Sequence, residues 1–313
     1  MTRPDPADIK HPRADWLALL PPGLPPTAAL TVAVLPPDDP DRAAYTEALY
    51  ASSDILRAVC FEAELKQAMQ AAGIRPGMRV LDAACGAGGK SHLLLEAGAD
   101  HVTGIDIDRE ALDLARRLPA HAAGQVVFQP ADLLRPLPFD DATFDAVYVG
   151  DGFIGIHDPV ALSELVRVLR PGGPLIFETV NVLPETLFAW DRGLQARVEA
   201  ATWQALAETD YAADGQTYEA AFHHTRAALG LDLMHLPVTR TAPFDPVLAH
   251  YLLARFACQV APLTWPHLDT ADHAALLRLY NPTASHSLFQ RADAAVTFHL
   301  SVLHGSPVLP PQR

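Results

Sequence analysis

Two acidic residues and a glycine-rich turn stand close together in the first third of the chain. Asp82 ends an apolar run that is typical of a buried strand, and Gly86 and Gly88 follow it. Because glycine has no side chain, a ligand can approach the backbone of such a turn closely. The helix expected after the turn would present unpaired N–H groups and its positive dipole end. Asp106 ends the next strand, about 20 residues after Gly86, the spacing at which an acid can bind the hydroxyls of a ribose.

These residues predict a cofactor that carries a nucleoside, and two details indicate which kind. A dinucleotide site of the G-x-G-x-x-G type requires glycine at its last position, where this chain has Ser91. The carboxylate of Asp82 would also repel a passing pyrophosphate, whereas it suits a cationic amino group. A sulfonium nucleoside with an amino-acid tail therefore fits this turn better than a dinucleotide does.

The elements that must position these residues alternate regularly up to about residue 180. Apolar runs typical of strands lie at 79–82, 101–106, 125–129, 144–149 and 175–179. Helical patterns follow the first, second and fourth of these runs. Strands and helices that alternate in this way form parallel βαβ units with right-handed crossovers. The expected fold class is thus α/β, with a doubly wound, mainly parallel, Rossmann-like sheet.

About residues 78–180 resemble the class I S-adenosylmethionine-dependent methyltransferases. The matching motifs, in order, are Asp82 to Gly88 with Ala84 in place of a glycine, Asp106, Asp132, Phe144 to Val147, and Arg167 to Gly173. The resemblance implies S-adenosylmethionine as cofactor and S-adenosylhomocysteine as product. It implies cofactor contacts from Asp82, Ala84, Gly86, Gly88, Asp106, Ile107, Asp132, Leu133 and Gly150.

The segment after the fourth strand is expected to lie beside the reactive methyl group. Relatives often carry a histidine near this point, where the present chain has Gly155, with His157 two positions further on. Asp151 and His157 are the candidate general bases, and the alternative is that they only pack the loop or contact the cofactor tail.

The remaining segments suggest a core with additions at both ends. The expected divisions are a proline-rich segment at 1–40, helices at 41–75, the cofactor-binding core at 76–183, a helical cap at 184–283, and a hairpin at 284–313 that completes the sheet. The helices of the cap are expected at 194–208, 218–229, 247–257 and 271–279. The antiparallel hairpin is expected to pair 286–290 with 295–303.

Composition excludes several classes of function. The net charge is −14 and no run rich in Lys and Arg occurs, which disfavours nucleic acid as a partner. Apolar runs are too short for a membrane span or a signal peptide, and the three cysteines form no disulfide framework or zinc pattern. The histidines and acids of 184–283 lack a metal-binding spacing, so no metal is expected. These features favour a cytoplasmic protein that acts on a small molecule.

The function expected from these observations is methyl transfer from S-adenosylmethionine to a small-molecule acceptor. A nicotinamide-dependent oxidoreductase would share the sheet, but Ser91 and Asp82 disfavour it. A binding protein that retains the cofactor pocket without catalysis is the other alternative. The sequence does not indicate the acceptor atom or the oligomeric state.

Overall fold

The computed structural model describes residues 12–20, 26–36, 38–150, 159–178, 186–187, 191–208 and 232–304. The chain divides into two compact units. The sheet unit contains Phe61–Val180, Gln216–Val238 and Phe298–Arg313, and the helical unit contains Met1–Cys60, Asn181–Gly215 and Thr239–Thr297.

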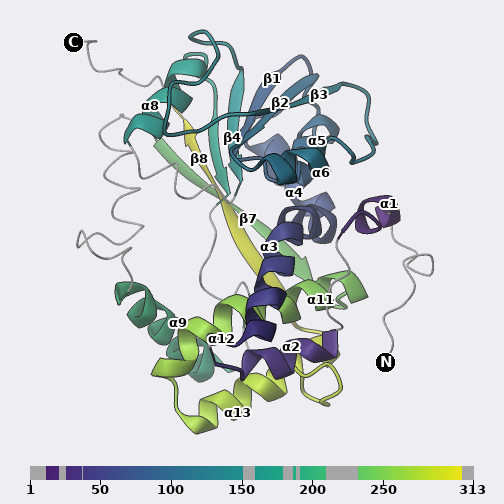
Figure 1. Cartoon of the computed structure of the whole chain (residues 1–313), viewed down its shortest axis with the longest axis vertical. Helices are drawn as coiled ribbons and strands as arrows, with labels where there is room; N and C mark the ends of the chain where they lie inside the picture. Colours follow the sequence, from purple (N-terminus) through teal and green to yellow (C-terminus); the bar gives the residue numbers. More distant parts are fainter. Residues whose placement is uncertain are drawn as a thin grey trace. The chain divides into compact units, whose positions relative to one another are not determined.

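The sheet unit is built on five parallel strands (Figure 1). They are β1 (Arg79–Ala83), β2 (His101–Asp106), β3 (Gln125–Pro130), β4 (Ala146–Gly150) and β5 (Leu175–Glu178). Their order is β3-β2-β1-β4-β5, and β8 (Ala295–His304) pairs antiparallel with β5. The doubly wound, mainly parallel fold expected from the sequence is confirmed. The strand order reverses between β1 and β4, and ligands of such sheets bind outside the carboxyl ends at this point.

Side chains alternate between the two faces of this sheet. On one face, residues of β1, β4 and β5 join the core cluster with helix α8 (Pro159–Val168). The other face of these strands carries Asp82, Tyr148 and Glu178, because successive side chains point to opposite sides. Helices α5 (Gly89–Glu96) and α6 (Arg109–Ala115) pack beside β1, β2 and β3 (Figure 1).

Helix α4 (Glu62–Ala71) leads into the sheet unit and packs on α5. Its buried side is apolar, because Leu65 and Met69, and Phe61 directly before the helix, are all fully buried. Lys66, on the same helix, pairs with Glu62 and with Glu96 at the end of α5.

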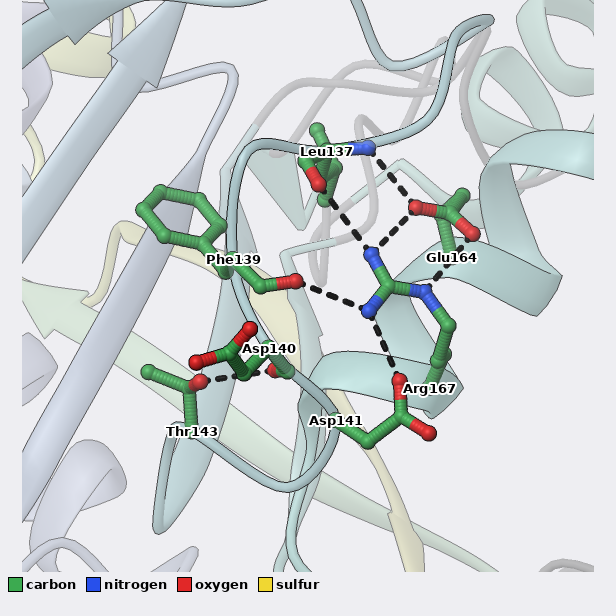
Figure 2. A network of polar contacts seen from close by, with 7 residues as sticks. All are labelled: Leu137, Phe139, Asp140, Asp141, Thr143, Glu164 and Arg167. Carbon is green, nitrogen blue, oxygen red and sulfur yellow. Dashed lines mark hydrogen bonds and ion pairs between the residues drawn. The ribbon is translucent and has the colours of Figure 1, made fainter.

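A polar network fixes the loop that leads into β4 (Figure 2). The guanidinium of Arg167 on α8 forms two hydrogen bonds with Glu164 and one with Asp141, and donates to the carbonyl oxygens of Leu137 and Phe139. Glu164 also accepts the backbone N–H of Leu137 at 2.7 Å. Arg167 lowers the pKa of Glu164, and the carboxylates in turn raise the pKa of Arg167. The loop is therefore anchored by charge-assisted bonds to the helix that follows β4.

The strand expected at 295–303 is present as β8, but its expected hairpin partner is not a strand. Residues Leu288–Gln290 form a 3₁₀ turn, and Gln290 N–H donates locally to the carbonyl of Ser287. β8 pairs also with β7 (Asp232–Thr241), from the stretch expected to be a helical cap. The prediction failed because five alternating residues fit a strand or a turn equally well. Pro237 lies within β7, which pairs with β8 alone among the described strands, and proline is tolerated on such an edge.

The helical unit contains two groups of helices. The first is α1 (Ala14–Leu17), α2 (Pro26–Ala33) and α3 (Pro40–Cys60). The second is α9 (Arg192–Ala207), α11 (Pro246–Arg255), the π-helical turn η3 (Phe256–Val260), α12 (Ala261–Thr264), the 3₁₀ turn η4 (Trp265–His267) and α13 (Thr270–Leu279). A two-residue strand, β6 (Thr186–Leu187), pairs antiparallel with β8 in this unit.

Three of the expected cap helices correspond to α9, α11 and α13, and the one expected at 218–229 lies outside the described residues. Asp245 starts α11, since its carboxylate accepts the N–H groups of Val247 and Leu248. The segment expected at 41–75 contributes α3 to the helical unit and α4 to the sheet unit, and the domain boundaries stay predictions. Among the described helices, none has the length and apolar character needed to cross a membrane.

Candidate cofactor site

The turn after β1 has the left-handed backbone that favours glycine. The φ angles are +58° at Ala84, +52° at Gly86 and +79° at Gly88. Ala84 stands where the resembling family has glycine, so it holds a conformation that costs an L-residue about 1–2 kcal/mol. The departure noted in the sequence is therefore a point of backbone strain in the turn.

Gly88 is also required by packing inside the sheet unit. A Cβ atom at this position would lie 2.7 Å from Cζ of Phe128 and 2.8 Å from Cβ of Ala115. Phe128 likewise approaches Gly104, where a Cβ would lie 2.6 Å from its Cδ1 atom. The sequence suggested glycine for the approach of a ligand, and the structure adds that Phe128 of β3 fills the space behind the turn.

Asp106 is joined to this turn by a hydrogen bond. Its Oδ2 atom accepts the backbone N–H of Gly86 at 2.7 Å, and its Oδ1 atom accepts the N–H of Asp108 at 2.9 Å. A carboxylate has about four acceptor positions, so these bonds orient Asp106 and leave it able to accept further donors. Asp108 caps α6 by accepting the N–H groups of Glu110 and Ala111, so the two acids have separate tasks.

Residues after β2 and β3 border the same edge of the sheet. Ile107, directly after Asp106, is 72% exposed, so its apolar side chain is accessible at this edge. Asp132 and Leu133 follow β3, whose last residue pairs with Asp106. Asp132 accepts the N–H of Leu134 and lies 3.3 Å from Arg135, so it also shapes its own loop.

Asp82 belongs to a buried polar cluster that the sequence did not predict as a whole. Its side chain is fully buried, and Oδ2 accepts the hydroxyl of Ser91 at 2.5 Å. Ser91 is the residue that broke the dinucleotide pattern, and the structure gives it this partner. Tyr148 is the β4 residue in register with Asp82, and its hydroxyl donates to Glu178 at 2.9 Å. Lys90 lies 3.4 Å from the same Glu178 oxygen.

Burial of this cluster changes the chemistry of its phenol. Desolvation raises the pKa of Tyr148 well above its usual value, and the nearby carboxylates of Glu178 and Asp82 act in the same direction. The phenol therefore stays protonated and acts as a donor. One sequence signal could have revealed the cluster, since Lys90 begins an apolar helix and Glu178 ends an apolar strand. Charged residues in such positions need buried partners.

The acceptor side of the site is only partly covered by the described residues. Gly150 ends β4 and is in register with Glu178. The candidate bases Asp151 and His157 lie outside the described residues. Among the residues that the structure describes, no three metal-ligating side chains gather into a possible metal site.

Comparisons with known proteins match the segment of the chain that contains this turn. Residues 80–173 match the family model described as "Methyltransferase domain". Malonyl-[acyl-carrier protein] O-methyltransferase of Erwinia billingiae is 40% identical over 119 residues, which cover 37% of this chain and 45% of that protein. Demethylmenaquinone methyltransferase of Staphylococcus aureus is 37% identical over 114 residues, 36% of this chain and 46% of that protein. Cycloartenol-C-24-methyltransferase 1 of Oryza sativa subsp. japonica is 37% identical over 103 residues, which cover 32% of this chain and 30% of that protein.

The sheet has a Rossmann-like order, and residues 80–173 within it match a methyltransferase domain. Residues 80–173 belong to the class I S-adenosylmethionine-dependent methyltransferases. The chain spans less than half the length of each of these three relatives.

Proposed function

We propose that the protein transfers a methyl group from S-adenosylmethionine to a small-molecule acceptor. The observation that supports this most directly is the hydrogen bond from Gly86 N–H to the Asp106 carboxylate, at the edge where the strand order reverses. It holds an acid and a glycine turn together within the segment that matches the methyltransferase domain.

The donor set of this edge fits the proposed cofactor. Asp106 would bind the ribose hydroxyls, Ile107 would cover an apolar face of the adenine, and Asp132 and Leu133 would border its edge. The glycine turn with Ala84, Gly86 and Gly88 would pass along the amino-acid tail, with Gly150 opposite and Asp82 favouring its ammonium group. When bound, the cofactor supplies a methyl group on a sulfonium, which a nucleophile attacks in line.

The task of the chain in this reaction is to orient the acceptor and exclude water. Positioning of this kind lowers the barrier because it replaces a bimolecular encounter by a fixed geometry. We assign Asp151 and His157 as the residues that would accept a proton from an acceptor that is not already ionised.

A small molecule is the acceptor class that composition supports. The net charge of −14 disfavours a polyanionic acceptor such as nucleic acid. The three relatives are named for three different acceptors, so their names do not favour one acceptor for this chain. We further propose a cytoplasmic location, because Cys60, Cys85 and Cys258 are buried thiols, as expected in a reducing compartment.

Calorimetric titration with S-adenosylhomocysteine tests this function. The wild type should bind, and Asp106→Asn should weaken binding at least about tenfold, or about 1.4 kcal/mol. Asn keeps one oxygen that can accept the N–H of Gly86, so the bond to the turn can persist while the bond to Asp108 and the charge that favours the ribose are lost. Asp113→Ala is the matched control, since it removes an exposed acid of α6 that pairs with Arg116. Binding of a nicotinamide dinucleotide in place of S-adenosylhomocysteine would overturn the proposal.

A further inference from the structure

Lys90 is a buried cation in the first turn of α5, directly after the glycine turn. Only 1% of its side chain is exposed, and its ammonium lies 3.4 Å from Oε2 of Glu178, whose side chain is fully buried. Glu178 also accepts the hydroxyl of Tyr148 at 2.9 Å. The pair therefore links α5 to the carboxyl ends of β4 and β5 inside the sheet unit.

A side chain at residue 150 would meet the stem of Lys90. A Cβ atom on Gly150 would lie 2.5 Å from Cε of Lys90 and 3.1 Å from its Nζ atom. It would lie 3.0 Å from Cε1 of Tyr148 as well. The space beside Gly150 is thus occupied by Lys90, so a side chain there would push Lys90 away from Glu178.

The same helical turn also holds the end of β1. Ser91, next to Lys90, donates its hydroxyl to Asp82 at 2.5 Å. One turn of α5 therefore contacts the carboxyl ends of three strands, through Asp82, Gly150 and Glu178. These ends form the edge at which the strand order reverses.

We propose that Lys90 is a positioning residue for the cofactor: by pairing with Glu178 and filling the space beside Gly150, it holds the ends of β4 and β5 in the arrangement that binds the amino-acid tail. This inference rests on the proposed function, because the ligand it concerns is S-adenosylmethionine or its product. On this view, a substitution of Gly150 changes cofactor binding because it displaces Lys90.

The first test measures the dissociation constant of S-adenosylhomocysteine by calorimetry, together with thermal unfolding. Lys90→Met keeps much of the stem and removes the charge, and we expect the dissociation constant to rise at least about tenfold. Lys66→Met is the matched control, because Lys66 is likewise a paired lysine of the sheet unit, bonded to Glu62 and Glu96, but is 27% exposed. It should change the dissociation constant by less than about twofold, as expected of a partly exposed pair.

The second test is a double-mutant cycle between Lys90 and Gly150. Gly150→Ala should weaken binding in the wild type, since the added methyl group displaces the ammonium from Glu178. In a Lys90→Ala background, Gly150→Ala should raise the dissociation constant less than about threefold, because the main clash is gone. The remaining increase would come from the contact with Tyr148. Equal effects of Gly150→Ala in both backgrounds would overturn the proposal, since Gly150 would then act on the cofactor directly.

Folding defects are separated from positioning by removing both charges. Lys90→Met leaves the Glu178 carboxylate without the ammonium, which is costly in a buried site. The variant Lys90→Met with Glu178→Gln removes that cost and should unfold near the wild-type temperature, yet bind S-adenosylhomocysteine at least about tenfold more weakly. If this variant binds like the wild type, the pair only stabilises the fold and the proposal is wrong. If the wild type itself fails to bind, the proposed function falls, and this inference falls with it.

Discussion

Gly86 donates its backbone N–H to Oδ2 of Asp106 at 2.7 Å, so the turn after β1 and the acid that ends β2 form one hydrogen-bonded unit. The bond fixes the carboxylate relative to the turn before any ligand binds. A site arranged in this way loses little conformational freedom on binding.

This bond predicts a difference between two substitutions of Asp106. Asp106→Ala leaves the N–H groups of Gly86 and Asp108 without their acceptor and should lower the free energy of unfolding by about 1–2 kcal/mol. Asp106→Asn keeps one acceptor oxygen, enough for one of these two N–H groups, and should therefore lose less than Asp106→Ala does. Urea denaturation of the two variants measures this, and equal losses would show that the bond contributes little to the turn.

Strain at Ala84 predicts a stabilising substitution. Ala84→Gly relieves the positive φ of +58°, and part of the gain is offset by the greater freedom of glycine in the unfolded chain. We expect the free energy of unfolding to rise by about 0.5 kcal/mol. Ala142→Gly, with φ of +54°, should behave in the same way. Ala97→Gly is the control. Because Ala97 has a φ of −72°, this change relieves no strain and should lower the free energy of unfolding. Destabilisation at Ala84 would contradict the strain argument.

The network around Arg167 predicts a large effect far from the cofactor turn. Arg167→Met removes the donors to Glu164, Asp141 and two carbonyl oxygens, and should lower the free energy of unfolding by about 2 kcal/mol (Figure 2). Arg116→Met, in an exposed pair with Asp113, should lower it by less than about 0.5 kcal/mol. Denaturant titration compares them, and losses of similar size would mean that the loop before β4 does not depend on Arg167.

The ion pair between Glu164 and Arg167 predicts that the stability of the fold depends on pH. Arg167 lowers the pKa of Glu164 in the folded state. The ionised carboxylate therefore stabilises the fold above the pKa that Glu164 has in the unfolded chain. This stabilisation is lost as the pH falls through the pKa of Glu164 in the folded state. The difference in unfolding free energy between wild type and Glu164→Gln should be largest near neutral pH and should shrink under acid conditions. Denaturation series at several pH values would measure this, and a constant difference would refute it.

Much of the sheet unit could be predicted from local patterns. The five parallel strands each show an apolar run of suitable length, and the turn after β1 shows glycines between a strand and a helix. Because the carboxyl ends of adjacent parallel strands meet at one edge, the strand pattern also predicted that Asp82 and Asp106 would lie near the turn. The roles assigned to the cofactor and acceptor residues stay predictions.

The pairings that depend on distant segments could not be predicted in this way. β8 pairs with β5 and with β7, and no local pattern in 286–304 distinguishes those partners from a hairpin of its own. The Lys90–Glu178 pair likewise depends on β5 lying next to β4.

Residue order alone was thus sufficient for the class of fold, the glycine turn and the acid at the end of the next strand. These features are encoded by hydrophobic periodicity and by residues with special backbone preferences, which act over a few positions. The buried cluster of Lys90, Tyr148 and Glu178 was decided by the tertiary structure. Its charges are stabilised only when three distant segments exclude water around them together. A local pattern can mark a charged residue as buried, but it does not indicate which distant segments will surround that residue.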